Sequence, residues 1–246
     1  MEREKLRDLD ISGSGSVAGG LYDSVDISGS GKVTGDIECR TFDASGSSHV
    51  KGDIHTHSFD LSGSSHVHGD VTAVTIDSSG SSHISGHVIT DQLESSGAMR
   101  VGKDLTGKTL DISGFVTIGG DCTADLFNAQ GAFTVGGVLN ANTIDVRLDH
   151  DAKADKILGE SIQIRKRQRW SFISKLLDLF LTERALKADL IEGHYIILEN
   201  TVAKIVRGDN VYIGRGCDID VVEYSTDCHV NDDADVATQR KIDCSG

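Results

Sequence analysis

Three histidines recur at equal intervals, because His49, His66 and His83 are each 17 residues apart. If one turn of the fold takes 17 residues, their imidazole rings lie one above another, and Zn²⁺ or Ni²⁺ could bridge them. Three surface rings in a repeat can equally be copies of one tolerated residue, so this alternative stays open. We predict no resident metal or cofactor. The neighbouring histidines of the column are His55, His57, His68 and His87.

Aspartates recur at the same interval, which raises the question of cation binding. The pattern GGxGxDxUx of calcium-binding solenoids is absent from the chain. We therefore expect these carboxylates to accept hydrogen bonds from backbone N–H groups at corners and to face water, with a cation ladder as the alternative. One such column comprises Asp36, Asp53, Asp70, Asp104 and Asp121.

The sequence offers no catalytic constellation, and we predict a protein that is not an enzyme. No Ser-His-Asp set is identifiable, and the five cysteines contain no CxxC pair. The rival enzyme class is a hexapeptide-repeat acyltransferase, because "VYIGRGCDI" at 211–219 resembles a piece of that left-handed β-helix. Such a solenoid needs an apolar residue every six positions, whereas residues 10–147 keep a period of 17.

The 17-residue period is carried by glycines and apolar columns. A second glycine follows most marker glycines by six residues, and a valine or isoleucine follows each by four. Glycines at fixed offsets indicate corners that need either a positive φ or a close backbone approach. The markers are Gly13, Gly29, Gly46, Gly63, Gly80, Gly97, Gly114 and Gly131, with one step of 16 and the others of 17.

Three short segments with alternating apolar and polar residues lie between successive markers, which is the pattern of half-buried strands. Three strands per repeat with glycine at the corners predict an all-β, three-sided parallel β-helix of about 17 residues per coil. The chain contains no proline, as expected where every strand donates its N–H groups to the next coil. We expect eight regular coils and one irregular coil over residues 10–164, after an N-terminal tail of residues 1–9.

A basic segment interrupts the repeat, and we predict one inserted amphipathic α-helix over 165–185. Its apolar positions would form a wide face next to a cluster of positive charge, which suits a membrane surface, a partner, or the end or side of the solenoid. The residues proposed for this contact are Arg165, Lys166, Arg167, Arg169, Trp170, Phe172, Ile173, Leu176, Leu177 and Phe180.

After the helix, residues 186–230 return to short apolar strands with glycine at the corners, which predicts further β-helix coils. Residues 231–246 are acidic and weakly patterned, so we expect a C-terminal tail there.

Charge and composition limit the partners. The formal net charge of −14 argues against nucleic acid, whose binding proteins concentrate positive charge. The N-terminal "MEREKLRDLD" lacks the apolar core of a signal peptide. We therefore expect a cytoplasmic protein, with the inner face of the cell membrane as a peripheral site if the basic helix binds lipid.

The repeating "DISGSGKVTGDIECRTFDASGSSHVKGDI" and the later "ADLIEGHYIILENTVAKIVRGDNVYIGRGCDIDVVEYS" resemble the bactofilins, in particular the longer polymer-forming cytoskeletal proteins of Gram-positive bacteria. The resemblance covers most of residues 10–225. It implies a right-handed β-helix that pairs end to end into non-polar filaments without nucleotide. It also implies a scaffold for membrane, cell-wall or motility machinery, with a co-polymerising paralogue as a further partner.

The residues themselves also point to self-assembly. A solenoid that starts within about ten residues of Met1 has little chain to cover its first coil, and an uncovered strand edge recruits another edge. We predict a homopolymer, with a non-polymerising binding module as the alternative. The residues expected at the polymerising N-terminal end are Ile11, Val17, Leu21 and Val25.

Overall fold

The computed structural model describes residues 6–166 and 185–243, and within these ranges the regular secondary structure consists of strands alone. Their pairing is parallel, as in a β-solenoid, so the predicted all-β class and parallel coils are confirmed. The chain divides into two compact units, Met1–Ala124 and Asp125–Gly246. Each unit is described by itself. The predicted helix over 165–185 falls mostly on 167–184, which lie outside the described residues.

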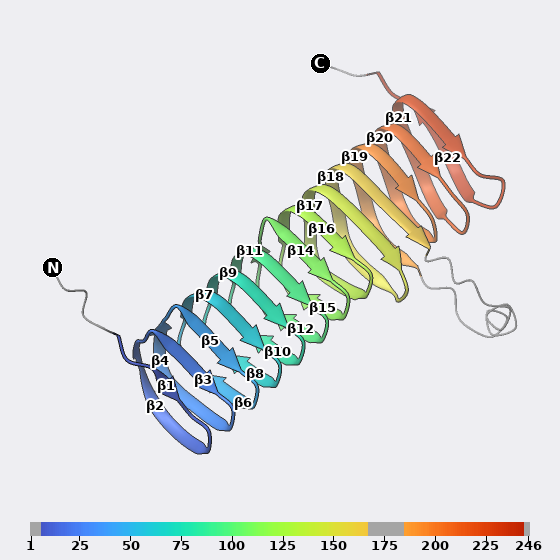
Figure 1. Ribbon diagram of the computed structural model, residues 1–246. Coiled ribbons are helices and arrows are strands. Elements are labelled where there is room, and N and C mark those ends of the chain that lie inside the picture. Colours follow the sequence, from blue (N-terminus) through green and yellow to red (C-terminus); the bar gives the residue numbers. More distant parts are fainter. Residues whose placement is uncertain (1–5, 167–184, 244–246) are drawn as a thin grey trace, which may run out of the picture. The chain divides into compact units, whose positions relative to one another are not determined.

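Unit 1 contains short strands that succeed one another at the corners of each coil (Figure 1). Its strands are β1 (Leu9–Asp10), β2 (Ser14–Leu21), β3 (Ser24–Ile27), β4 (Ser30–Glu38), β5 (Thr41–Ala44), β6 (Ser47–Val50), β7 (Ile54–Leu61), β8 (Ser64–Val67), β9 (Val71–Ser78), β10 (Ser81–Ile84), β11 (Val88–Ser95), β12 (Ala98–Val101), β13 (Leu105–Thr106), β14 (Thr109–Ile112) and β15 (Phe115–Ile118).

The register of unit 1 reproduces the period of the sequence. From β3 to β15, paired residues are 17 positions apart, as for Ser64 with Ser81. Between β2 and β4 the offset changes from 16 to 17, and the change occurs at an irregularity between Ala18 and Gly20. Gly20 has a φ of +157°, which glycine adopts without the strain that a side chain would cause. A β-bulge of this kind absorbs the one short step in the glycine series.

The core of unit 1 consists of the apolar columns, stacked so that like residues touch. The rings of Phe42 and Phe59 are fully buried, and their centroids lie 5.1 Å apart. The column four residues after each marker glycine is buried from Val33 onward, because β-strand alternation turns each of these side chains inward. A coil thus completes its core only against its neighbours.

The marker glycines are required by close approach of the backbone. A Cβ atom on Gly63 would collide with the carbonyl oxygen of Gly46, and one on Gly46 would collide with that of Gly29. Gly13 differs, because a Cβ placed there meets no atom within 4 Å. The first marker has no earlier coil to approach, so only the later ones are sterically restricted.

Unit 2 has longer strands and variable coil lengths. Paired residues are 15 positions apart between β19 and β20, but 34 apart between β18 and β19, where the chain passes through 167–184. The pairing of Ala152 with Leu186 therefore holds despite the extra residues. The strands are β16 (Cys122–Ala129), which begins in unit 1, β17 (Ala132–Leu148), β18 (Ala152–Lys166), β19 (Leu186–Leu198), β20 (Thr201–Ile213), β21 (Asp218–Val230) and β22 (Asp235–Lys241).

Two segments differ from the sequence expectation. Arg165 and Lys166, expected to open the helix, are the last residues of β18, where they pair with Arg147 and Leu148 of β17. Residues 235–241, assigned to an acidic tail, form β22, which pairs with β21. Charged residues are compatible with both positions because these side chains are exposed and only the backbone joins the ladder.

Candidate functional site

The first coil, formed by β1 and β2, is paired on one side only within the described residues. β1 pairs with β3, and β2 pairs with β4. The opposite edge of each strand therefore presents backbone groups that no described strand takes up. Such an edge is a template for another strand.

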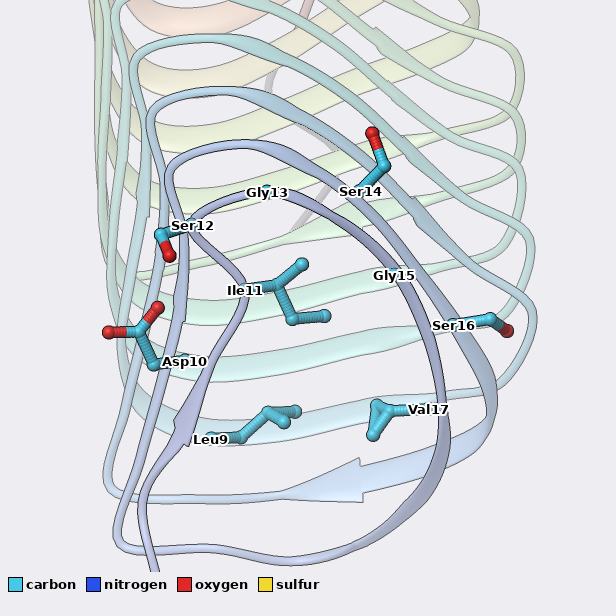
Figure 2. A pocket seen from close by; sticks show the side chains of 9 residues that line it. All are labelled: Leu9, Asp10, Ile11, Ser12, Gly13, Ser14, Gly15, Ser16 and Val17. Carbon is cyan, nitrogen blue, oxygen red and sulfur yellow. The ribbon is translucent and has the colours of Figure 1, made fainter.

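The first coil also encloses a hollow of about 320 Å³ that is lined by Leu9–Val17. Figure 2 shows the side chains of Leu9, Ile11 and Val17 pointing into the loop of the coil, whereas Asp10 and Ser16 point outward. This alternation continues the inward columns of later coils. The hollow is the end of the apolar core.

The four residues predicted for the polymerising end occupy different positions. Ile11 and Val17 line the hollow, with Ile11 8% exposed. Leu21 ends β2 and is 57% exposed, so it is an apolar side chain on the surface of the same coil. Val25 lies in β3 and is buried, so it belongs to the core behind the opening. The structure thus brings Ile11 and Val17 together and separates Leu21 and Val25 from them.

Sequence reasoning missed the contacts that fasten residues before β1. The guanidinium carbon of Arg7 lies 5.5 Å from the ring centroid of Tyr22, a cation–π arrangement. The Tyr22 hydroxyl donates to the carbonyl of Ala18 at 3.1 Å, and the Ser24 hydroxyl donates to Oδ1 of Asp8 at 2.8 Å. No other coil has an aromatic residue at the position of Tyr22, so the repeat gave no signal for this anchor.

The aspartate column caps the corners, as the sequence analysis expected. Oδ1 of Asp36 accepts a hydrogen bond from the backbone N–H of Asp53 at 2.9 Å, and Asp53 accepts one from Asp70 at 2.8 Å. Asp70 and Asp104 repeat the contact with His87 and Asp121. Each carboxylate therefore satisfies a backbone donor of the next coil.

The predicted histidine column is present. The rings of His66 and His83 stack with centroids 4.6 Å apart, and those of His49 and His66 lie 5.3 Å apart. His68 joins the column, with its ring centroid 4.4 Å from that of His66. His87 instead forms an ion pair with Asp104 at 3.3 Å.

An alternating row of charges joins four strands of unit 2. We call Glu192, Arg207, Glu223 and Arg240 the ion-pair ladder, because each residue is paired in register with the next. Arg207 contacts Glu192 at 3.1 Å and Glu223 at 2.7 Å, and Arg240 contacts Glu223 at 3.0 Å. The ladder fastens β22 to the unit. Its members are 15, 16 and 17 residues apart, so no fixed period reveals it in the sequence.

The predicted membrane or partner contact is described only in part. Arg165 and Lys166 are exposed, and the N–H of Lys166 donates to Oε2 of Glu199 at 2.9 Å. Its other residues lie outside the described ranges: Arg167, Arg169, Trp170, Phe172, Ile173, Leu176, Leu177 and Phe180. Over 6–166 and 185–243, no helix has the length and apolar character needed to cross a bilayer.

The stacked coils with an open first coil define a parallel β-solenoid protein. The family model of the bactofilins, described as polymer-forming cytoskeletal proteins, matches residues 5–89, a segment that includes the first coil. Residues 5–89 are accordingly a bactofilin domain, which supports membership of the chain in that family.

Two curated relatives come from Bacillus subtilis (strain 168), and both are described as uncharacterized. YhbF is 35% identical over 106 residues, which cover 43% of this chain and 42% of the relative. YhbE is 37% identical over 106 residues, which cover 43% of each chain. The match thus spans less than half the length of either relative. No solved structure matches the chain significantly.

Proposed function

We propose that the protein is the subunit of a cytoskeletal polymer and that two copies join through their first coils. The description of the matching family as polymer-forming supports self-assembly, and the match includes the first coil. The observation that carries the location is the combination of one-sided strand pairing with an apolar hollow at the same place. Later coils of unit 1 cover their inward residues with a neighbour, and only a second copy offers the first coil a matching surface.

Like ends joining is a self-complementary contact, since each copy contributes the same surface. In such a junction Ile11 and Val17 would be covered by the hollow of the partner, and Leu21 would lie at the rim. Burying apolar area contributes about 25 cal/mol per Å² before the costs of association. A filament built this way also needs C-terminal ends to join, and β22, paired in the described residues with β21 alone, is the surface proposed for that junction.

The polymer would act as a cytoplasmic scaffold for membrane, cell-wall or motility machinery, with a paralogue as a co-polymerising partner. The basic and apolar segment from Arg165 to Phe180 is proposed as its contact with a membrane surface or a partner. Vesicles containing anionic lipid should bind the purified protein, and Trp170→Glu with Phe172→Glu should abolish the binding. Equal binding by this variant would exclude a membrane role for the segment.

The assembly proposal is tested by negative-stain electron microscopy of the purified protein over a series of salt concentrations, without nucleotide or metal. We expect filaments from the natural sequence. Leu21→Arg places a charge on an exposed residue of the first coil, so it should prevent assembly while the circular dichroism spectrum stays unchanged. Val17→Arg should act in the same way inside the hollow.

Ile89→Arg is the matched control, because Ile89 is also an exposed apolar residue, at 53%, but lies in the middle of unit 1. It should leave the filaments intact. Filaments from both first-coil variants would reject this end as the junction. Loss of filaments in Ile89→Arg as well would mean that added positive charge, rather than position, prevents assembly.

A further inference from the structure

Three imidazoles of unit 1 converge at one place on the surface, and we call His49, His66 and His68 the histidine cluster. One ring nitrogen from each residue lies within 4.8 Å of those from the other two. Nε2 of His49 and Nε2 of His68 are 3.0 Å apart. Two nitrogens bound to one tetrahedral zinc ion at about 2.0–2.1 Å are separated by about 3.3 Å. The closest pair is therefore already near the spacing of two ligands.

The fold produces the cluster from two adjacent coils. His49 in β6 pairs in register with His66 in β8, so their side chains lie on the same outward face. His68 follows the inward Val67, and alternation returns its side chain to the outside just beyond the end of β8. From this corner His68 reaches back across the coil boundary to His49. A ligand held by all three residues would join the two coils.

The neighbours of the cluster hold it and limit it. The ring of His83 stacks on His66 with an interplanar angle of 15°, which fixes the orientation of that imidazole. Lys32 precedes His49 in the column, and Arg100 follows His83. These charged neighbours end the row of imidazoles at both sides.

The protonation of the rings favours ligand binding. Desolvation, followed by the charges of His68, Lys32 and Lys51, lowers the pKa of His49. Desolvation, followed by the neighbouring histidines His68, His83 and His49, lowers the pKa of His66. Both rings are therefore mainly neutral near pH 7, which is the form of histidine that coordinates a metal.

We propose that the histidine cluster binds one divalent transition-metal ion of the Zn²⁺ or Ni²⁺ class, with three imidazole ligands and water completing the coordination. Imidazole suits these ions, whereas Mg²⁺ and Ca²⁺ require oxygen ligands. The positive charges of Lys32 and Lys51 near His49 disfavour a cation held by charge alone. Only an ion that forms strong bonds to nitrogen overcomes this repulsion. The His49–His68 contact would then be replaced by two bonds to the metal.

The experiment is a titration of the full-length purified protein with Zn²⁺ in competition with a chromophoric chelator. We expect one tight site per chain. His68→Gln and His49→Gln each remove a ligand and should weaken binding at least about tenfold. His57→Gln is the matched control, since His57 is an exposed histidine of the coil between His49 and His66 but is not in the cluster. Its affinity should equal that of the natural sequence.

A second measurement does not depend on the variants. X-ray absorption of the Zn²⁺-loaded natural protein should show three imidazole ligands and one further light atom. The melting temperature should also rise on loading, because the ion joins two coils of the folded state and would be lost on unfolding.

Three results would overturn the proposal. They are no competition with the chelator, equal weakening by His57→Gln and His68→Gln, or an absorption spectrum with fewer than three imidazoles. The last two would indicate adventitious binding by scattered surface histidines.

Discussion

Nε of Arg207 lies 2.7 Å from Oε2 of Glu223, and the two residues face each other across adjacent strands of unit 2. The side chain of Glu223 is only 11% exposed, so its charge depends on its partners for solvation. Arg240 supplies the second partner from β22. The ion-pair ladder thus combines one buried carboxylate with two more exposed guanidinium groups.

Arg207→Ala should destabilise unit 2, because it leaves Glu223 with Arg240 alone and also removes the contact with Glu192. Arg207 is 43% exposed, so solvent screening reduces the effect to about 1–2 kcal/mol. Urea unfolding followed by circular dichroism measures the change. Lys204→Ala is the control, since its pair with Asp189 is exposed on both sides and should contribute nothing measurable. Equal destabilisation by the two variants would contradict a special role for the ladder.

His194 and Asp209 should give unit 2 a pH-dependent contribution to stability. Their side chains are 2.7 Å apart. The hydrogen bond to Asp209, and then its charge, raise the pKa of His194 above 6.5. Hydrogen bonds from Ser225 and His194 lower the pKa of Asp209 below 3.8.

The contribution from His194 is complete below pH 6.5 and is lost as pH rises through its raised pKa. The contribution from Asp209 is complete above pH 3.8 and is lost as pH falls through its lowered pKa. His194→Gln should therefore lower the melting temperature at about pH 5 and leave it unchanged at about pH 9. Asp209→Asn should remove the same coupling in a double-mutant cycle. A coupling that persists at the higher pH would show that charge is not its source.

Gly63→Ala should destabilise unit 1, because the new Cβ would collide with the carbonyl oxygen of Gly46. Relief requires the coils to move apart, at a cost of about 1–3 kcal/mol or more. Gly13→Ala is the same change at the same position of the repeat, where the space is open. Thermal unfolding should distinguish them, with Gly13→Ala close to the natural sequence. Equal tolerance of both substitutions would mean that the requirement for glycine is not steric.

The regular part of the fold could be predicted because its information is periodic. Each inward column, such as Phe42 and Phe59, repeats one residue type at one offset, and alternation then assigns the outward columns. The coil lengths of unit 2 were not predictable, since backbone pairing tolerates offsets of 15 and 34 without any change in residue type. The strand β22 was missed for a related reason, because its exposed charged residues lack an apolar pattern.

The candidate sites follow the same division. Ile11 and Val17 were identified from their columns, and the structure places both at the hollow. His68 was recognised as a neighbour of the column, but its approach to His49 depends on the corner after β8, which spacing does not describe. The anchor formed by Arg7 and Tyr22 depends on a residue that occurs once.

The constant offset of 17 from β3 to β15 has a genetic consequence. One coil corresponds to a whole number of codons, so recombination between neighbouring DNA repeats adds or deletes complete coils without a frameshift. Every coil gained or lost this way meets the same inward columns and the same aspartate caps. Unit 1 can therefore change its length in evolution by steps that are individually foldable, which accounts for the near-identity of its adjacent repeats.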